Sequence, residues 1–438
     1  MTKNPSKKFW LSLIIFSLVG QIAWVMENMY LNVFIYQRFN APADKIALMV
    51  SASAVAATVT TLLIGALSDK LGKRKLFISG GYICWGLSIW SFALINMKMP
   101  AIDYTAAALQ GVDQLTMMSM AASTGVSLVI LADCIMTFFG SAANDAAFNA
   151  WLTDSTDETN RGAAEGINSM MPMLAILVVF GGAMLLDPDA PSYWNIIFGF
   201  IGTAVLLLGV LGLFIIEEPK TDVSENTHYF KNLLYGFRPQ VIRSNPRLYW
   251  ALLAYAVFGI SIQVFMPYLI LYYEVSLKMQ NYVLIFAPAI VLAAAFTFFY
   301  GKVYDRKGFS FSILPALGLL MAGYLLLYFF RNSAIVFIGT LVMLCGYLAG
   351  MAVFGAMIRD NTPKNKAGMF QGQRIIAQVL IPGVIGPFLG SAILRNADKI
   401  VNSDGTTSFI PNGNIFLGGF VVGLLLLFTL IPLFRKKK

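Results

Sequence analysis

The sequence predicts an all-α membrane protein with twelve transmembrane helices, arranged as two pseudo-symmetric six-helix bundles. Of its 438 residues, 58% are hydrophobic and only 12% are charged, whereas soluble domains carry roughly 25% charged residues. Apolar runs recur along the whole chain, and many reach the roughly 20 residues that a helix needs to cross a bilayer. Two sequence patterns also occur once in each half of the chain, which indicates an internal repeat.

The predicted spans follow from these apolar runs. A polar stretch at 217–247, which contains the only histidine, His228, separates the sixth span from the seventh. We therefore expect an N-terminal bundle at 1–216, a cytoplasmic linker at 217–247 and a C-terminal bundle at 248–438. The predicted spans are 9–37, 43–68, 76–97, 126–151, 163–186, 194–216, 248–273, 280–301, 310–330, 334–358, 367–394 and 413–434.

The net charge of +9 is distributed unevenly across these spans. Twenty-three of the 31 Lys and Arg residues fall on one side of the predicted membrane, seven on the other, and Arg374 lies within a span. Positive charge accumulates on the cytoplasmic side of membrane proteins. This placement predicts cytoplasmic termini and a bacterial inner (plasma) membrane location, and it argues against a nucleic-acid partner.

The two halves of the chain can be aligned by two repeated patterns. A pattern of glycine and aspartate recurs at an offset of 236 residues, and the loops after the fourth and tenth spans match at an offset of 206, where Asp154 corresponds to Asp360. The two offsets differ by 30 residues, which locates an insertion at 98–125 in the first half. We expect an extracytoplasmic amphipathic helix there, although the sequence does not define its role.

The first glycine–aspartate pattern, at 65–74, resembles the signature loop between the second and third spans of the major facilitator superfamily. The resemblance implies two parallel six-helix repeats. It also implies a gating role for the glycine, aspartate and basic residues of this turn between two helices. Glycine permits the tight turn, aspartate can face a helix N-terminus, and the basic pair can bind acidic groups. The candidate gating residues are Gly65, Asp69, Gly72, Lys73 and Arg74 in the first copy, and Gly301, Asp305 and Gly308 in the second, where Tyr304 replaces Ser68.

Two acidic residues lie within predicted spans, Glu27 in the first and Asp133 in the fourth. Ionisable groups at this depth are costly and usually face a cavity or a partner. We interpret them as ion-coupling residues for protons or sodium; a structural hydrogen-bonded role is the alternative.

Polar side chains on several spans indicate a solute cavity. Amides beside a tryptophan suit a neutral, hydroxylated ligand because paired polar groups replace its hydration, although the same amides can instead join helices. Arg374 could bind an anion or neutralise a carboxylate. The candidate substrate-binding residues are Gln21, Trp24, Asn28, Asn32, Thr137, Gln263, Arg374 and Gln378.

The stretch 149–161 is locally similar to the loop after helix four in melibiose-type glycoside/cation symporters and sucrose transporters. The melibiose-type branch places acidic cation ligands in its second helix, but residues 43–64 contain none apart from Asp44 at the edge. This difference favours protons over sodium.

Together these features predict a secondary active transporter that moves a small solute, a sugar or glycoside, by proton-coupled alternating access. Export of drugs or other amphiphilic compounds is the alternative, and a non-transporting membrane sensor is the alternative of another class. We expect no enzyme activity, cofactor or metal, since no phosphate-binding loop or metal-ligand spacing occurs. The expected partners are the substrate, the coupling ion and the lipid bilayer, and we expect a monomer; the substrate and direction of transport stay open.

Overall fold

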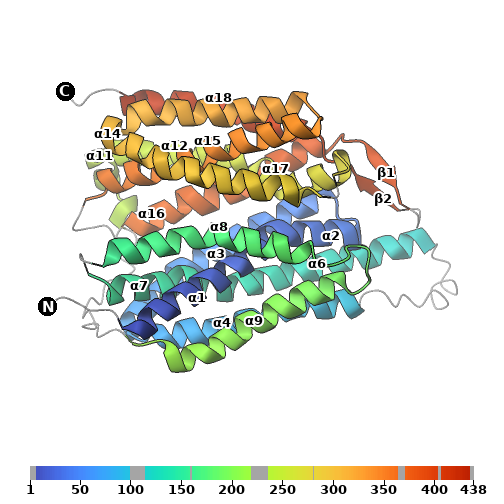
Figure 1. Ribbon diagram of the computed structural model, residues 1–438, viewed down its shortest axis with the longest axis horizontal. Coiled ribbons are helices and arrows are strands. Elements are labelled where there is room, and N and C mark those ends of the chain that lie inside the picture. The colour runs from blue at the N-terminus through green and yellow to red at the C-terminus, as the bar shows by residue number, and fades with distance from the viewer. Residues whose placement is uncertain are drawn as a thin grey trace. The chain divides into compact units, whose positions relative to one another are not determined.

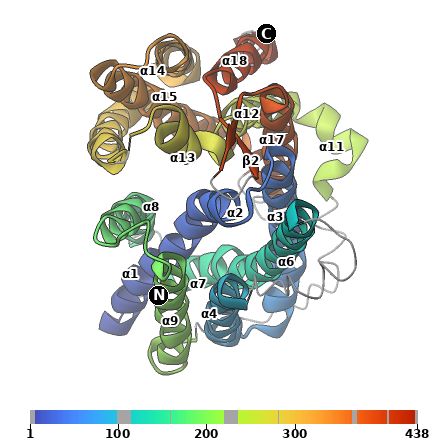
Figure 2. The ribbon, with the colours of Figure 1, turned by 90° about the vertical axis from the view of Figure 1, so that its right-hand side faces the viewer.

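The computed structural model describes residues 6–98, 114–157, 160–218, 235–279, 281–363, 370–402 and 406–434. The chain packs as two compact units. One comprises Met1–Thr227 with Ile400–Ser408, and the other comprises His228–Lys399 with Phe409–Lys438. Both units are built from long helices, which Figure 1 shows from the side and Figure 2 shows end-on.

The N-terminal unit contains six membrane-length passes in its described residues. The first and fourth passes are each interrupted by a π-helical segment, in which one extra residue widens a turn. The elements are α1 (Lys7–Val25), a π segment (Met26–Tyr30), α2 (Leu31–Phe39), α3 (Ala43–Leu71), α4 (Arg74–Lys98), α6 (Gln114–Gly140), a π segment (Ser141–Phe148), α7 (Asn149–Ser155), α8 (Arg161–Ala183) and α9 (Tyr193–Ile215).

Small residues bring α4 and α9 into close contact in this unit. A Cβ atom on Gly86 would lie 2.6 Å from the carbonyl oxygen of Gly202, and a Cβ on Gly202 would lie 3.0 Å from that of Gly86. Lipid tails are as apolar as the helix side chains, so the hydrophobic effect does not drive membrane helices together. They associate through close packing, which small residues permit. The pair forms one side of the bundle, while α1 packs against α8 and α9.

The C-terminal unit is also helical, and its first and fifth passes contain π-helical segments. Its elements are a 3₁₀ turn (Tyr235–Phe237), α11 (Pro239–Ser244), α12 (Pro246–Gln263), a 3₁₀ turn (Met266–Tyr268), α13 (Leu269–Leu271), a π segment (Tyr272–Ser276), α14 (Val283–Phe329), α15 (Ser333–Asn361), α16 (Gln371–Ile375), a π segment (Ile376–Leu380), α17 (Ile381–Leu394) and α18 (Asn414–Phe434). Between α17 and α18 in sequence lies a two-stranded hairpin, β1 (Lys399–Val401) and β2 (Thr407–Phe409), most of which groups with the N-terminal unit.

The 47-residue helix α14 contains the eighth and ninth predicted spans. Its backbone leaves the helical conformation at Gly308, where φ is 73° and ψ is −178°. A positive φ favours glycine because it has no Cβ, so this residue allows the two spans to turn without a long loop. The described residues contain eleven helices of membrane length, and the bend divides one of them, which confirms the predicted twelve-helix class.

The start of the fourth pass differs from the sequence-based expectation. This pass was expected to begin at residue 126, but α6 begins at Gln114, so part of the predicted insertion extends this helix. The rest of the predicted insertion helix, residues 99–113, lies outside the described residues.

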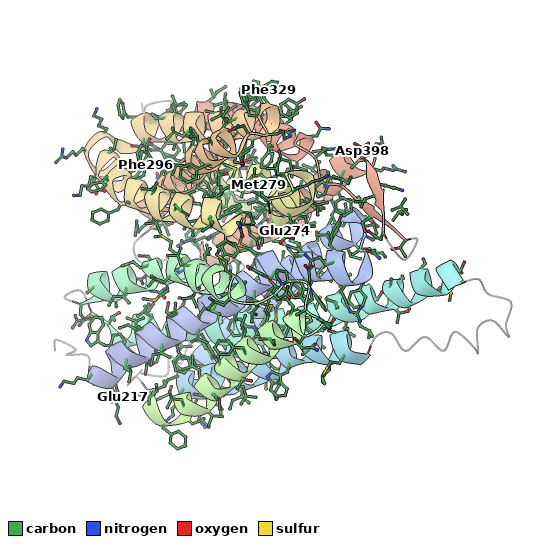
Figure 3. All side chains as sticks on the ribbon, turned by 45° about the vertical axis from the view of Figure 1, so that its right-hand side comes forward. Glu217, Glu274, Met279, Phe296, Phe329 and Asp398 are labelled. Carbon is green, nitrogen blue, oxygen red and sulfur yellow. The ribbon has the colours of Figure 1, made fainter. Side chains whose placement is uncertain are left out.

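The hairpin β1–β2 was not predicted. Figure 3 labels Asp398, which precedes its first strand. Residues Ile400–Ser408 group with the N-terminal unit, where Asn40 accepts hydrogen bonds from Ser408 Oγ at 3.0 Å and from Asn402 Nδ2 at 3.1 Å. Strands of only three residues each are too short to show the alternating pattern from which a strand is predicted.

Candidate functional site

Glu27 lies in the first π segment and is only 6% exposed. Its Oε1 accepts hydrogen bonds from Ser53 Oγ of α3 at 2.6 Å and from Thr137 Oγ1 of α6 at 2.8 Å. The two hydroxyls are also 2.8 Å apart, so the three side chains form a closed triangle. Three passes that are far apart in sequence therefore meet at one carboxyl group.

Asp133 lies on α6 one turn before Thr137, is 1% exposed, and interacts electrostatically with Glu27. Glu27 Oε2 and Asp133 Oδ1 are both buried without a hydrogen-bond partner in the structure. Such unpaired buried oxygens are uncommon in folded proteins. The cluster of Glu27, Ser53, Thr137 and Asp133 is hereafter the carboxyl cluster.

The charge balance of the carboxyl cluster is incomplete. In the described part of the chain, no lysine or arginine pairs with either carboxyl group, and an isolated buried carboxylate is strongly unfavourable. Protonation or a bound monovalent cation would supply the missing charge. The searched residues contain no group of three His, Cys, Asp or Glu side chains suited to a metal ion.

Aromatic rings lie beside the first pass in the N-terminal unit. The ring of Trp24 packs against that of Trp85 at a centroid distance of 5.0 Å. Gly140 makes room for both, since a Cβ there would come within 2.7 Å of Trp85 and 3.1 Å of Trp24. The indole nitrogen of Trp85 is buried without a partner, so a donor is available in this region; Gln21 is half-buried.

The two asparagines predicted to bind substrate bond within their own pass. Asn28 Nδ2 donates to the carbonyl of Trp24 at 2.8 Å, and Asn32 Nδ2 donates to the carbonyl of Asn28 at 3.0 Å. Their amide nitrogens are therefore engaged locally, while Asn32 Oδ1 is buried without a partner. The structure leaves acceptor capacity at Asn32 rather than two free amides.

A third carboxyl group occurs in the second π segment. Asn144 Nδ2 lies 3.4 Å from Asp145 Oδ1, and Tyr82 OH donates to Asn144 Oδ1 at 3.0 Å or to the Phe16 carbonyl at 2.8 Å. Asp145 was not among the predicted coupling residues, although it lies within the predicted span 126–151. The signal was present, because an acidic residue within a span is by itself a functional candidate.

The remaining predicted substrate residues lie in the C-terminal unit, on α12, on α16 and in the π segment that follows α16. Arg374, in α16, is exposed and interacts electrostatically with Tyr255 of α12. Gln378 lies in the π segment that follows, and Gln263 ends α12, where Gly386 packs against its Cβ. Both glutamines are half-buried.

The predicted gating turn places Arg74 at the centre of a polar network. Its Nε donates to Asp154 Oδ2 at 2.9 Å, and its Nη1 donates to Ser68 Oγ at 2.5 Å. Gly72 adopts φ 62° and caps α3, so the turn requires glycine for the reason given for Gly308. Lys73 is exposed.

Gly65 and Asp69 are the other predicted gating residues of the first copy. Gly65 is half-buried within α3. The side chain of Asp69 lies outside the described atoms, so its predicted contact with a helix N-terminus stays a prediction.

The second copy of the pattern makes an analogous contact with different chemistry. Tyr304, which replaces Ser68, donates its hydroxyl to Asp360 Oδ2 at 2.5 Å. Asp154 and Asp360 are the positions that the 206-residue offset relates, so each unit joins its gating turn to the corresponding aspartate. Asp305 is exposed, and Gly301 is helical with open space around it.

Ser53 is a functional candidate that the sequence did not predict. The second span contributes a hydroxyl group to the carboxyl cluster, not an acidic cation ligand. A serine among alanines in an apolar helix gives no distinctive pattern, because serine is also common where helices merely pack closely.

The fold and the buried cluster define a class of polytopic membrane transporter, and sequence comparison identifies the family. The Major Facilitator Superfamily model matches residues 9–387. The chain belongs to the major facilitator superfamily. No curated protein matches the sequence.

Solved structures share the fold at low sequence identity. The inward-open xylose transporter XylE from E. coli aligns with a TM-score of 0.70 and 12% identity, covering 98% of this chain and 97% of that one. The nucleoside transporter NupG aligns at 0.68 and 12%, covering 97% and 99%. An inward-facing bacterial homolog of the human lysosomal transporter Spinster aligns at 0.68 and 13%, covering 97% and 96%.

Proposed function

We propose that this transporter carries a neutral, hydroxylated solute, a sugar or glycoside, in symport with protons. The observation that carries the proposal is the Glu27 carboxyl group, which is buried and held at one oxygen by Ser53 and Thr137 while its other oxygen has no partner. Asp133 adds a second carboxyl beside it without adding a cation.

The coupling step follows from the cost of this burial. With the cluster enclosed, a proton on Glu27 removes the unfavourable charge. When the cluster opens to water, the carboxylate can be solvated and the proton can leave. A carrier that closes when Glu27 is protonated and solute is bound, and again after both have left, moves the two together, because closure of either partly loaded form is disfavoured.

Hydroxyl donors give the site a way to exchange the proton. Ser53 and Thr137 can each donate to ionised Glu27 or accept from its protonated form, since a hydroxyl is both donor and acceptor. The unpartnered oxygens of Glu27 and Asp133 provide two places for the proton. We propose that Asp133 shares it, and that Asp145, twelve residues further along the pass, receives it on the way out.

The solute class is supported by the groups near Glu27. The Trp24–Trp85 pair offers an aromatic face, and the Trp85 nitrogen and Asn32 Oδ1 offer an unpaired donor and acceptor. This combination suits a ligand with both hydroxyls and an apolar face. The similar structures include a D-xylose–proton symporter, at 13% identity and a TM-score of 0.69. That likeness supports the fold, and its solute is compatible with the proposal.

The polar networks at the gating turns complete the mechanism. We propose that the Arg74–Asp154 pair and the Tyr304–Asp360 bond fix the turn within each unit as the units change their relative orientation. By the distribution of positive charge, these turns and both termini lie in the cytoplasm. The transporter then acts as a monomer in a bacterial inner membrane, with uptake as its direction.

Export of amphiphilic compounds is the second candidate, and one cavity favours it. The N-terminal unit has a cavity of about 310 Å³ whose lining includes Ile22, Tyr30, Val179 and Ile197. An apolar cavity beside the coupling segment could accept a hydrophobic solute. Uptake of a cationic dye would favour this candidate, whereas uptake of a free sugar would exclude it as the main activity.

The test uses purified full-length protein in proteoliposomes with radiolabelled xylose as the first probe, followed by other pentoses, hexoses and glycosides. We expect at least one of these solutes to accumulate when the outside is made acidic, and to do so without sodium. Accumulation driven by a sodium gradient alone would show that the coupling ion is sodium and not the proton. Absence of counterflow for every neutral solute tested would refute the proposed substrate class.

A further inference from the structure

A cavity of about 530 Å³ lies on α14 beside the bend at Gly308. It is remote in sequence from the carboxyl cluster and belongs to the C-terminal unit. Figure 3 labels Phe296, which lies on the same helix shortly before the cavity residues. The lining includes Phe299, Tyr300, Lys302, Arg306, Lys307 and Phe311.

The cavity combines three cations without an acidic counterpart. Lys302, Arg306 and Lys307 are exposed, and within the described residues none forms an ion pair. Asp305, between them in sequence, is also not paired with any of the three. An anion at this place would therefore gain attraction without first breaking a salt bridge.

Aromatic rings hold two of the cations. Lys302 Nζ lies 5.3 Å and 5.6 Å from the ring centroids of Phe298 and Phe299, and Lys307 Nζ lies 4.0 Å from that of Phe311. Cation–π contacts of this length are favourable and keep the ammonium groups near the rings. The ring contacts therefore hold two of the three positive charges, those of Lys302 and Lys307, beside the cavity while their side chains stay exposed.

The cavity is also fixed by the backbone. Tyr300 OH donates to the Ser312 carbonyl at 2.5 Å, which joins the part of α14 before the bend to the part after it. Gly308, at φ 73°, allows the chain to reverse between them. The two walls are thus connected by a hydrogen bond, so the cavity is built by the fold.

The cavity is bordered by aromatic side chains that are exposed on the surface of the protein. Phe298 is 69% exposed and Phe299 is 64% exposed, and both lie on a helix that spans the membrane. A ligand here would meet hydrocarbon on one side and fixed cations on the other. An inorganic anion would satisfy only the cations, whereas a phospholipid would also cover the exposed rings.

We propose that this cavity binds the phosphate-bearing headgroup of an anionic phospholipid, with the acyl chains against the exposed phenylalanines. Basic cavities between membrane helices recognise anionic headgroups, and each nearby Lys or Arg contributes about 1 kcal/mol, which corresponds to about fivefold in affinity. Three cations acting together predict a loss of roughly 100-fold when all are neutralised.

Native mass spectrometry of the detergent-solubilised full-length protein tests the proposal, with phosphatidylglycerol and phosphatidylcholine as probes. We expect phosphatidylglycerol to bind more tightly, and we expect Lys302→Gln/Arg306→Gln/Lys307→Gln to weaken it roughly 100-fold. The matched control is Lys7→Gln/Lys8→Gln/Arg243→Gln, which removes three exposed cations elsewhere and should leave the affinity near that of the wild type.

A second variant distinguishes binding of a phospholipid from binding of free phosphate. Phe299→Ala/Phe311→Ala keeps every charge, so it should weaken phosphatidylglycerol binding while inorganic phosphate fails to compete in either protein. If the triple variant does not fold, Lys302→Gln alone should show a loss of about fivefold. Equal losses in the two triple variants, equal binding of the two lipids, or displacement by inorganic phosphate would each overturn the proposal.

Discussion

Replacing Glu27 by Gln removes the charge that the proposal requires while keeping the shape of the side chain. The amide oxygen can still accept from Ser53 and Thr137, which lie 2.6 and 2.8 Å from Oε1 in the native protein. The unpartnered Oε2 position becomes an NH₂ group beside Asp133. The variant should therefore fold and bind solute, but it should no longer carry a proton at this position.

The expected magnitude follows from the number of protons moved. One elementary charge crossing a potential of 100 mV corresponds to about 2.3 kcal/mol, which is equivalent to a concentration ratio of roughly 50. If Glu27 carries the one coupled proton, the wild type should approach this accumulation, and Glu27→Gln should approach a ratio of about 1. Solute counterflow, which needs no net proton movement, should persist in the variant.

The assay compares counterflow and potential-driven accumulation in the same proteoliposomes, using whichever solute the screen that begins with xylose identifies. Glu217→Gln is the matched control. Glu217 accepts a hydrogen bond from Ser6 at 2.6 Å near the end of the sixth pass, away from the carboxyl cluster, and it is labelled in Figure 3. Glu217→Gln should accumulate solute like the wild type. Undiminished accumulation by Glu27→Gln would show that the coupled proton binds elsewhere.

Two further predictions concern the gating turns and are measured by thermal unfolding in detergent. Gly308→Ala should lower the unfolding free energy by about 1–3 kcal/mol, because alanine is strained at φ 73°. Gly301 lies within the helix with open space around it, so Gly301→Ala should be neutral or slightly stabilising, and equal effects of the two substitutions would contradict the backbone argument. Arg74→Ala should cost about 1–3 kcal/mol, since it removes the ion pair that joins Arg74 to Asp154 at 2.9 Å, while exposed Lys73→Ala should change stability by less than about 0.5 kcal/mol. An Arg74→Ala protein as stable as the wild type would show that the network is not structural.

The sequence predicted the features that follow from repetition and hydropathy. Twelve passes could be counted because the bilayer sets the length of each apolar run. The offset of 206 residues related Asp154 to Asp360, and the structure shows each of them bonded to its own unit's gating turn. A sequence repeat identifies corresponding positions even where the bonded side chains differ, as Arg74 and Tyr304 do.

The features that were missed depend on packing. The π segment around Glu27 adds one residue to a turn, and a helical wheel at 3.6 residues per turn cannot anticipate that shift. The contribution of Ser53 depends on the rotation of α3 against α6, which hydropathy leaves undetermined. The hydrogen bonds from Asn28 and Asn32 to carbonyls of their own pass were likewise not predicted, and the role of both residues in substrate binding stays a prediction.

Solute-dependent proton movement tests the central claim most directly. Proteoliposomes containing a trapped pH-sensitive dye would be given an inward gradient of the transported solute, with no other driving force. The account predicts acidification of the lumen by the wild type and none by Glu27→Gln, with solute counterflow retained by both proteins. Downhill solute uptake by the wild type without any change in lumenal pH would contradict it.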